Sequence, residues 1–396
     1  MNHLFSPLTL RGREIRNRIL STGHDTTLPT DGTVNEALIA YHRARAKGGV
    51  GLIVTQVAGV HETARYTSHL LMATDDACIP GYRALADAVH AEGTAIISQL
   101  FHPGREIMES ADGLLAVAWA PSVVPNERFH VMPRELDEAM IAEIMAGYAA
   151  SAARLAAAGF DGVEYVASHG YLPAQFLNPR VNLRTDAWGQ DRTKFLRECL
   201  QAMRAVVPDD FIIGMRISAD EREEAGLQAD EMLEACRRLE PLVDYLNVTV
   251  GTSATMGGAV HIVPPMAYSA GYLADAAARV KQAVSVPVFV AGRINQPQVA
   301  EAIIAAGQAD MCGMTRALIA DPDMPVKAQA GRLDDIRACI GCNQACIGHF
   351  HRGLPISCIQ HPETGRELRF GTLPAAPRRK RVMVVGGGPA GMKAAA

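Results

Sequence analysis

Short runs of β-branched and other apolar residues alternate along the chain with longer stretches of helical periodicity. Amphipathic or alanine-rich segments, such as residues 137–158 and 296–306, separate these apolar runs. The alternation is typical of an α/β protein whose parallel sheet is covered by helices. Eight runs fit buried strands, at residues 15–22, 50–58, 94–102, 161–168, 211–218, 245–250, 286–292 and 309–315.

Three of the predicted helices end in glycine just before the next strand. These endings are KGG at 47–49, AAG at 157–159 and AAG at 305–307. Glycine is favoured there because the residue after a helix often adopts the left-handed conformation. Eight repeats of strand and helix predict a closed (β/α)8 TIM barrel, with an open doubly wound sheet as the alternative.

The character of the chain changes after the eighth repeat, and we predict three parts. Residues 1–335 would form the barrel, and residues 336–370 a cysteine-rich segment. Residues 371–396 would hold a proline-rich, basic linker and the truncated start of a Rossmann-type domain. In that start, residues 381–385 are predicted as a strand, followed by the glycine pattern G-x-G-x-x-G at 386–391. The chain ends at Ala396, before any acidic ribose ligand.

Bulk composition narrows the possible partners and location. The 396 residues are 48% hydrophobic and 20% charged, with a net charge of −4, which gives no reason to expect nucleic acid or an anionic membrane surface. No apolar stretch reaches the roughly 20 residues of a membrane span, and the N-terminus lacks a secretory signal, which predicts a cytoplasmic protein. Its eight cysteines are then expected to be thiols or metal ligands rather than disulfides.

Polar residues stand where several predicted strands end, and barrel enzymes keep their working residues at these positions. The last two strands end in Gly292-Arg293 and in Gly313 followed by Arg316, a combination that suits a phosphate. A purely structural barrel would have apolar residues at such positions. The polar set is Thr22, Gln99, His102, His169, Tyr171, Arg216, Arg293 and Arg316.

Seven sequence features together resemble the Old Yellow Enzyme family, in its multidomain iron–sulfur branch with 2,4-dienoyl-CoA reductase and trimethylamine dehydrogenase. The resemblance covers nearly the whole chain. Its marks are Asn17-Arg18, Gln99, HGYLPAQFLNP at 169–179, RTDAWGQD at 184–191, MRIS at 215–218, AGRIN at 291–295 and MTRALIADP at 314–322.

The resemblance implies a non-covalent FMN at the mouth of the barrel. Its phosphate would be held by Gly292, Arg293, Gly313 and Arg316. A cationic arginine against the ring would stabilise the negative charge that reduced flavin gathers. The alternative role of that arginine is a salt bridge inside the barrel. The residues implied to face the ring are Thr22, Ala58, Gln99 and Arg216.

The same resemblance implies that Tyr171 donates a proton to the substrate and that His169 binds a substrate acceptor atom. Tyrosine, with an ordinary pKa near 10, is a neutral donor at pH 7. The alternative is a rim aromatic beside a structural histidine. Many single-domain relatives have a second histidine where Val166 stands. The resemblance therefore supplies only one of the two hydrogen-bond donors that those relatives offer to a substrate carbonyl. His261 is a candidate for the second polar group.

Four cysteines form the pattern C-x2-C-x3-C-x11-C, which suits either an iron–sulfur cluster or structural zinc. They are Cys339, Cys342, Cys346 and Cys358. The surrounding CIGCNQAC resembles the cluster loop of 2,4-dienoyl-CoA reductase, which implies a [4Fe-4S] cluster. The remaining cysteines are expected in the core: Cys78, Cys199, Cys236 and Cys312.

The leading hypothesis is reduction of an activated C=C bond in an enoyl- or dienoyl-type small molecule. Electrons would run from NAD(P)H through an FAD domain and the cluster to FMN. The alternative is an amine dehydrogenase or N-demethylase, with electrons flowing out through the cluster. Asp25 stands at the position that resembles the flavin-linking cysteine of trimethylamine dehydrogenase, and that enzyme's cation-binding residues are replaced within 252–258.

A third hypothesis is a non-catalytic, flavin-binding scaffold. Substrate specificity is expected to lie in the loops 103–135 and 252–272. The sequence leaves open the choice of NADH or NADPH and the oligomeric state, with a homo-oligomer as one expectation.

Overall fold

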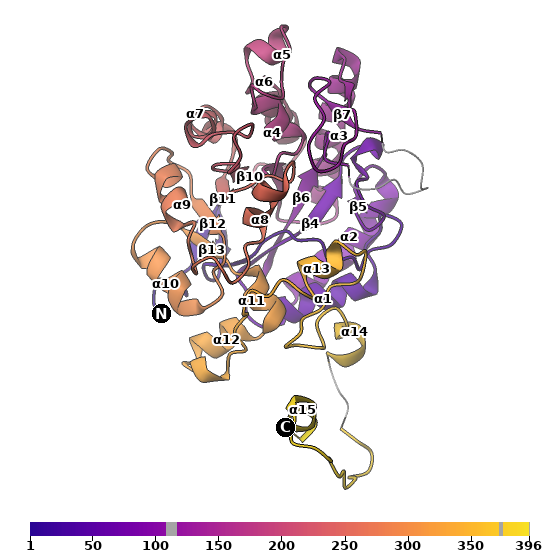
Figure 1. The fold of residues 1–396 in the computed structure, drawn as a ribbon, viewed down its shortest axis with the longest axis vertical. Helices are drawn as coiled ribbons and strands as arrows, with labels where there is room; N and C mark the ends of the chain where they lie inside the picture. The colour runs from indigo at the N-terminus through magenta and orange to yellow at the C-terminus, as the bar shows by residue number, and fades with distance from the viewer. Residues whose placement is uncertain (108–116, 372–374, 396) are drawn as a thin grey trace.

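The computed structural model describes residues 1–107, 117–371 and 375–395, and its centre is a closed barrel of eight parallel strands (Figure 1). The first strand, β3, pairs with both β13 and β4, which closes the ring and rules out an open sheet. Seven strands lie within their predicted ranges, and β4 ends one residue later. The strands are β3 (Ile19–Ser21), β4 (Leu52–Gly59), β6 (Ala95–Phe101), β9 (Gly162–Ala167), β10 (Ile212–Ser218), β11 (Tyr245–Thr249), β12 (Val288–Ala291) and β13 (Met311–Gly313).

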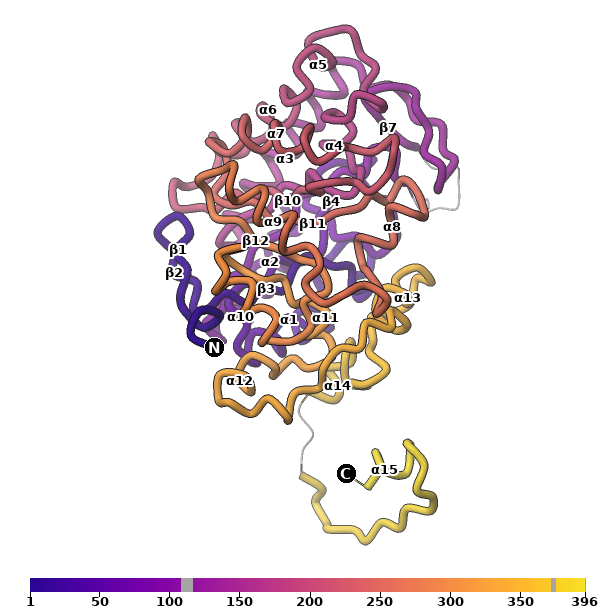
Figure 2. Tube along the Cα trace, turned by 60° about the vertical axis from the view of Figure 1, so that its left-hand side comes forward, coloured from indigo at the N-terminus to yellow at the C-terminus, as the bar shows by residue number. Residues whose placement is uncertain are grey.

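The helices that follow these strands form the outer layer of the barrel (Figures 1 and 2). Both alanine-rich segments that we predicted as helices are helical, as α3 and α10. Gly49, Gly159 and Gly307 have positive φ, as the predicted helix endings require. The main outer helices are α1 (Glu36–Lys47), α2 (Ile79–His90), α3 (Glu138–Ala157), α6 (Lys194–Arg204), α7 (Ala229–Leu239), α9 (Ala274–Lys281), α10 (Pro297–Ala305), α11 (Thr315–Ala320) and α12 (Met324–Gln329).

The amino-terminal end of the barrel is filled by side chains. The hairpin of β1 (Leu8–Leu10) and β2 (Arg13–Ile15) covers it with Leu10 and Ile15. Beneath the hairpin, Tyr245 and Phe289 stack with ring centroids 4.4 Å apart. Each such buried side chain contributes about 1.5–3 kcal/mol. Open space in the barrel is therefore confined to its carboxyl end.

The remaining helices and strands are short and lie in the loops and in the segment after the barrel. Of the predicted specificity loop 103–135, residues 108–116 lie outside the described residues. Within the described ranges, no helix has the length and apolarity to cross a bilayer. The short elements are η1 (Glu62–Ala64), β5 (Leu71–Met72), η2 (Asp76–Cys78), β7 (Trp119–Ala120), β8 (Arg134–Glu135), α4 (Leu172–Leu177), α5 (Ala187–Gln190), η3 (Glu240–Leu242), α8 (Met256–Ile262), η4 (Leu333–Asp335), α13 (Ile347–Phe350), α14 (Glu367–Phe370) and α15 (Pro389–Ala395).

A buried ion pair fastens the cysteine-rich segment to the barrel. Arg45 of α1 donates from Nη1 to Oε1 of Glu367 in α14 over 2.9 Å. The side chains are 0% and 4% exposed, respectively. The guanidinium also lies over the ring of Tyr41, 3.3 Å from its centroid. Because both charged groups are removed from water, the attraction between them is needed to offset the cost of their desolvation.

The predicted strand at 381–385 is wrong. These residues have no strand partner in the described part of the chain, and Val382, Met383 and Val385 are 79%, 85% and 84% exposed. A single strand cannot satisfy its backbone groups or bury its side chains without neighbouring strands. The helix expected after the glycine run is present as α15, which the ribbon and the Cα tube both show apart from the barrel (Figures 1 and 2). Residues 372–374 of the predicted linker lie outside the described residues.

Candidate active site

A cavity of about 460 Å³ opens at the carboxyl end of the barrel. Its volume falls in the usual range for a small-molecule or cofactor site. The mouth of the barrel is therefore hollow rather than packed with side chains. Nine of the ten predicted cofactor-binding and catalytic residues line it: Thr22, Gln99, His169, Tyr171, Arg216, Gly292, Arg293, Gly313 and Arg316.

Ala58 is the predicted residue that does not line the cavity. Its side chain is fully buried in the core between the barrel and the outer helices, and Val57 faces the cavity instead. The pairing of β4 with β6 contains a register shift between Thr55 and Val57. A bulge of this kind breaks the alternation of inward and outward side chains, which the sequence pattern did not reveal.

Arg216 projects from β10 into the cavity and is 6% exposed. Its Nη1 is buried with no hydrogen-bond partner among the described residues. Arg216 makes no ion pair with any of the described residues, which counts against the alternative of a salt bridge inside the barrel. Burial lowers the pKa of Arg216, while Glu164 acts in the opposite direction. A buried, unpaired guanidinium N–H suits an anionic or strongly accepting ligand edge.

A polar layer beneath Arg216 holds Gln99 in place. The Nε2 of Gln99 donates to Oε1 of Glu164 over 2.6 Å. The other carboxylate oxygen of Glu164 accepts from Tyr245 Oη and Asn247 Nδ2, each over 2.9 Å. Because its Nε2 is committed to Glu164, the amide of Gln99 has a fixed orientation at the cavity floor.

Arg293 and Arg316, which follow the last two strands of the barrel, lie at the other end of the cavity. Arg293 has φ +52°, and its Nη1 is buried without a partner in the described ranges. Nη1 of Arg316 donates to Pro264 O over 2.8 Å and to Asn343 Oδ1 over 2.7 Å. A Cβ on Gly313 would lie 2.6 Å from Cγ2 of Thr22, so only glycine fits there. Two guanidinium groups next to a glycine, where the backbone N–H groups can approach a ligand closely, suit the binding of a phosphate group.

Tyr171 and His169 stand together at the start of α4. The ring of Tyr171 meets Phe101 edge-on at 4.6 Å and His169 at 5.9 Å. Burial raises the pKa of Tyr171, so the phenol keeps its proton at neutral pH. Burial and Arg216 lower the pKa of His169, so its ring is neutral. The backbone of His169 is held at φ +62° by hydrogen bonds to Ser218 and Ser253.

His261, the candidate for the second polar group at the substrate, does not face the cavity. That residue is in the last turn of α8, packs against Tyr268 at 5.1 Å and does not line the cavity. Val166, by contrast, does line it. The hypothesis that His261 supplies a second donor therefore has no geometric support.

Two carboxyl groups on the cavity wall were not predicted to act there: Asp25, which was noted only as the counterpart of a flavin-linking cysteine, and Glu106. Asp25 accepts a hydrogen bond from Tyr66 Oη, and burial raises its pKa to about 6. Glu106 follows β6 and is fully buried. Neither position shows periodicity or a motif that marks it, because each lies on an irregular loop.

The four predicted cluster cysteines gather around one small cavity of about 20 Å³ beside the larger one. Cys339 and Cys346 line both cavities. No three metal-ligating side chains in the described residues are arranged to hold a single metal ion. Cys199, Cys236 and Cys312 are buried as predicted, whereas Cys78 is half-buried at the surface.

Comparison with known proteins identifies the family. Residues 3–335 match the NADH:flavin oxidoreductase / NADH oxidase family. A metal reductase from Desulforamulus reducens is 41% identical over 398 residues, covering 99% of this chain and 58% of that protein. An N,N-dimethylglycine/sarcosine dehydrogenase from Chromohalobacter salexigens is 36% identical over 405 residues, with the same coverages of 99% and 58%.

A solved 2-naphthoyl-CoA reductase complex superimposes with a TM-score of 0.92 at 31% identity, covering 99% of this chain and 62% of that one. The chain thus spans about three fifths of the length of these relatives. The family match, the barrel and its cavity agree with the resemblance seen in the motifs. The chain belongs to the NADH:flavin oxidoreductase / NADH oxidase family, of the Old Yellow Enzyme type, and has relatives in the multidomain iron–sulfur branch.

Proposed function

We propose that this chain reduces an activated C=C bond of an enoyl- or dienoyl-type substrate at the expense of NAD(P)H. The observation that carries the proposal is the buried Nη1 of Arg216, which has no hydrogen-bond partner among the described residues, in the same cavity as a protonated Tyr171. The FMN ring would lie against Thr22, Gln99 and Arg216. Its phosphate would bind at Gly292, Arg293, Gly313 and Arg316.

The chain's own residues would supply binding and proton transfer. FMN, when bound, would deliver a hydride from N5 to one carbon of the double bond. Tyr171 would give a proton to the neighbouring carbon, which completes the two-electron reduction. His169, neutral at its buried position, would hold the activating carbonyl. Arg216 would stabilise negative charge on the ring.

We further propose a [4Fe-4S] cluster on Cys339, Cys342, Cys346 and Cys358. The four thiols line one small cavity, and their spacing, with three cysteines inside eight residues and one distant partner, suits a polynuclear cluster better than a zinc site built from two paired knuckles. Such a cluster would supply one-electron transfer to and from FMN. The barrel would occupy 1–335 and the cluster segment 336–370. FAD and NAD(P)H would bind the domain that begins within 371–396.

A second candidate, oxidation or N-demethylation of a small N-methylated amine, is favoured by Asp25. Its Oδ1 is buried on the cavity wall with no hydrogen-bond partner in the described ranges. With a pKa of about 6, this carboxyl is ionised at neutral pH and could bind an ammonium group. Tyr66 and Tyr171 bring aromatic rings to the same place.

Anaerobic half-reactions of the intact-length, FMN-loaded protein test the two candidates. We expect photoreduced enzyme to be reoxidised by an enone or dienoyl thioester, observed as recovery of flavin absorbance. We expect no comparable bleaching of the oxidised enzyme by N-methylated amino acids. Bleaching by the amine together with inertness toward every enone would reverse the order of the two candidates.

Substitution Arg216→Leu should weaken binding of reduced FMN about tenfold more than binding of oxidised FMN, because a hydrogen bond from a charged donor to the ring edge is lost. Titration of the apoprotein with FMN in each redox state measures both constants. Arg279→Leu, at a half-exposed ion pair on α9, is the matched control. Equal losses for the two redox states would assign Arg216 a structural role only.

A further inference from the structure

We propose that Glu106 is a substrate-binding residue whose neutral carboxyl group donates the second hydrogen bond to the substrate carbonyl, beside His169. The inference rests on the proposed reduction of a carbonyl-activated double bond. It fills the place that His261 leaves empty, because Val166 and His261 supply no donor at this point of the cavity.

The position of Glu106 supports direct contact with substrate. It lines the cavity, yet its side chain is 0% exposed. Its Oε1 has no hydrogen-bond partner in the described structure. That oxygen lies 3.7 Å from the place where a Cβ on Gly170 would stand, between His169 and Tyr171. A donor at this point is adjacent to both predicted catalytic side chains.

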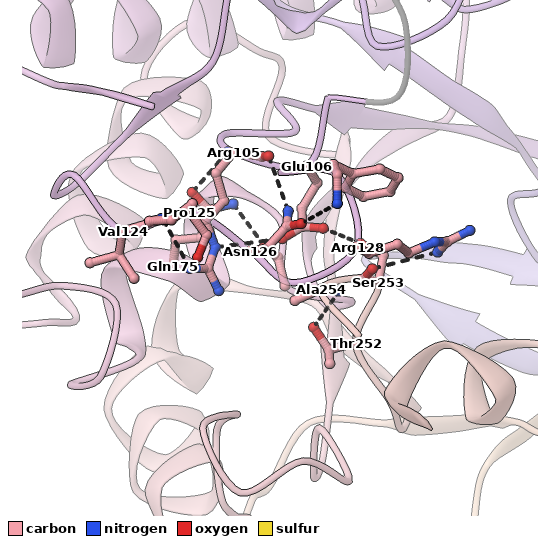
Figure 3. Close-up of polar contacts among 12 residues, drawn as sticks. Arg105, Glu106, Val124, Pro125, Asn126, Arg128, Gln175, Thr252, Ser253 and Ala254 are labelled. Carbon is pink, nitrogen blue, oxygen red and sulfur yellow. Dashed lines mark hydrogen bonds and ion pairs between the residues drawn. The ribbon is translucent and has the colours of Figure 1, made fainter. Parts of the chain in front are cut away.

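The other carboxyl oxygen is already engaged. Oε2 of Glu106 accepts from Ser253 Oγ over 2.9 Å, as the close-up of this cluster shows (Figure 3). Ser253 Oγ also lies 3.0 Å from His169 O. When the single hydroxyl proton of Ser253 points to Oε2, the acid proton of Glu106 resides on Oε1, which is buried and has no hydrogen-bond partner among the described residues.

The charges around Glu106 leave it neutral. Burial raises its pKa to about 8 and Glu221 acts in the same direction, whereas Arg105, the Ser253 hydrogen bond and the side chain of Asn126 oppose them. The Nε of Arg105 is 3.6 Å from Oε1, too far for a hydrogen bond, and its Nη1 donates instead to Val124 O and Pro125 O (Figure 3).

Three further charged or titratable groups face this site from neighbouring segments. Tyr171 and His169 are both neutral here, and Arg128 lies at the cavity edge with its Nη1 3.5 Å from Ser253 O. A carboxylic acid that its site keeps neutral can donate a hydrogen bond to a carbonyl as negative charge develops on the oxygen. Binding should therefore need the protonated form and weaken as the pH rises through about 8.

The test uses the intact-length, FMN-loaded protein and a saturated ketone analogue of an enone that it reduces. The analogue cannot react, and its binding is followed by the change in FMN absorbance. In the wild type we expect constant affinity at low pH and a loss of affinity as the pH rises above about 8. Glu106→Gln keeps a donor without a titration, so its affinity should stay within about twofold and lose the pH dependence. Glu106→Ala should bind roughly tenfold more weakly.

The matched control is Glu127→Gln, a carboxylate on the exposed surface of the same loop. Affinity in Glu106→Gln as low as in Glu106→Ala, or an unchanged pH profile in Glu106→Gln, would overturn the assignment. If Glu106→Ala does not fold, the pH profile of the near-isosteric Glu106→Gln decides alone. The proposed reductase function fails separately, when no enone reoxidises the photoreduced wild type.

Discussion

Substitution Tyr171→Phe should slow reoxidation of reduced FMN by an enone about a thousandfold, the usual scale for loss of a positioned proton donor. The edge-on contacts of the ring with Phe101 and His169 would remain, so only the hydroxyl is lost. FMN content and affinity for a saturated ketone should change little. Anaerobic stopped-flow measurement of flavin absorbance at a range of enone concentrations separates the rate of the chemical step from binding.

Tyr268→Phe is the matched control, because Tyr268 packs on His261 and does not line the cavity. Burial keeps the pKa of Tyr171 above its ordinary value. The wild-type donor therefore stays protonated through neutral pH, and its own titration should not limit the rate there. Wild-type speed in Tyr171→Phe would mean that water or another group gives the proton.

Substitution Glu367→Ala should lower the free energy of unfolding by about 3–5 kcal/mol, because it leaves the charge of Arg45 buried without a counterion. Arg45 is fully buried, and its Nε and Nη2 already lack hydrogen-bond partners within the described ranges. Besides Glu367, the main group that stabilises its charge is Tyr41, whose carbonyl oxygen accepts a hydrogen bond from Arg45 Nη1 over 2.5 Å. Urea unfolding, monitored by circular dichroism, measures the loss.

The double variant Arg45→Met with Glu367→Leu distinguishes an unpaired charge from lost packing. Apolar replacement of a buried ion pair is often neutral or stabilising, so most of the stability should return. Removal of the exposed pair Arg332–Asp335, 57% and 55% exposed, should cost no more than about 1 kcal/mol. A double variant as unstable as Glu367→Ala would show that side-chain packing, not charge, fastens α14 to α1.

The barrel was predictable from sequence because each buried strand is a short apolar run and three of the helices end at a clear glycine stop. The same logic failed at residues 381–385, where an apolar run lacks the neighbouring strands that would bury it. Local pattern can identify a segment that is able to form a strand. Only tertiary contacts decide whether it does.

The site was predictable where a motif fixes the backbone. Arg216 lies in β10 and Arg293 follows β12, two strands whose positions the pattern defined, and both arginines line the cavity. Ala58, which the resemblance placed at the ring, does not line the cavity, and a bulge shifts the alternation of side chains within β4 next to it. Glu106 was overlooked because its burial comes from packing between two loops that are about 150 residues apart.

The cysteine loop and the arginine end of the cavity share a wall. Asn295 Nδ2 donates to Cys339 O over 2.6 Å, and a Cβ on Gly341 would lie 2.4 Å from Nη1 of Arg293. A group that orders one side of this wall removes conformational freedom from the other. If the proposed FMN and cluster sites are both occupied, their binding should therefore be thermodynamically reciprocal, each raising the affinity of the other by the same factor. Assembly of the mature enzyme would then favour fully loaded and empty molecules over half-loaded ones.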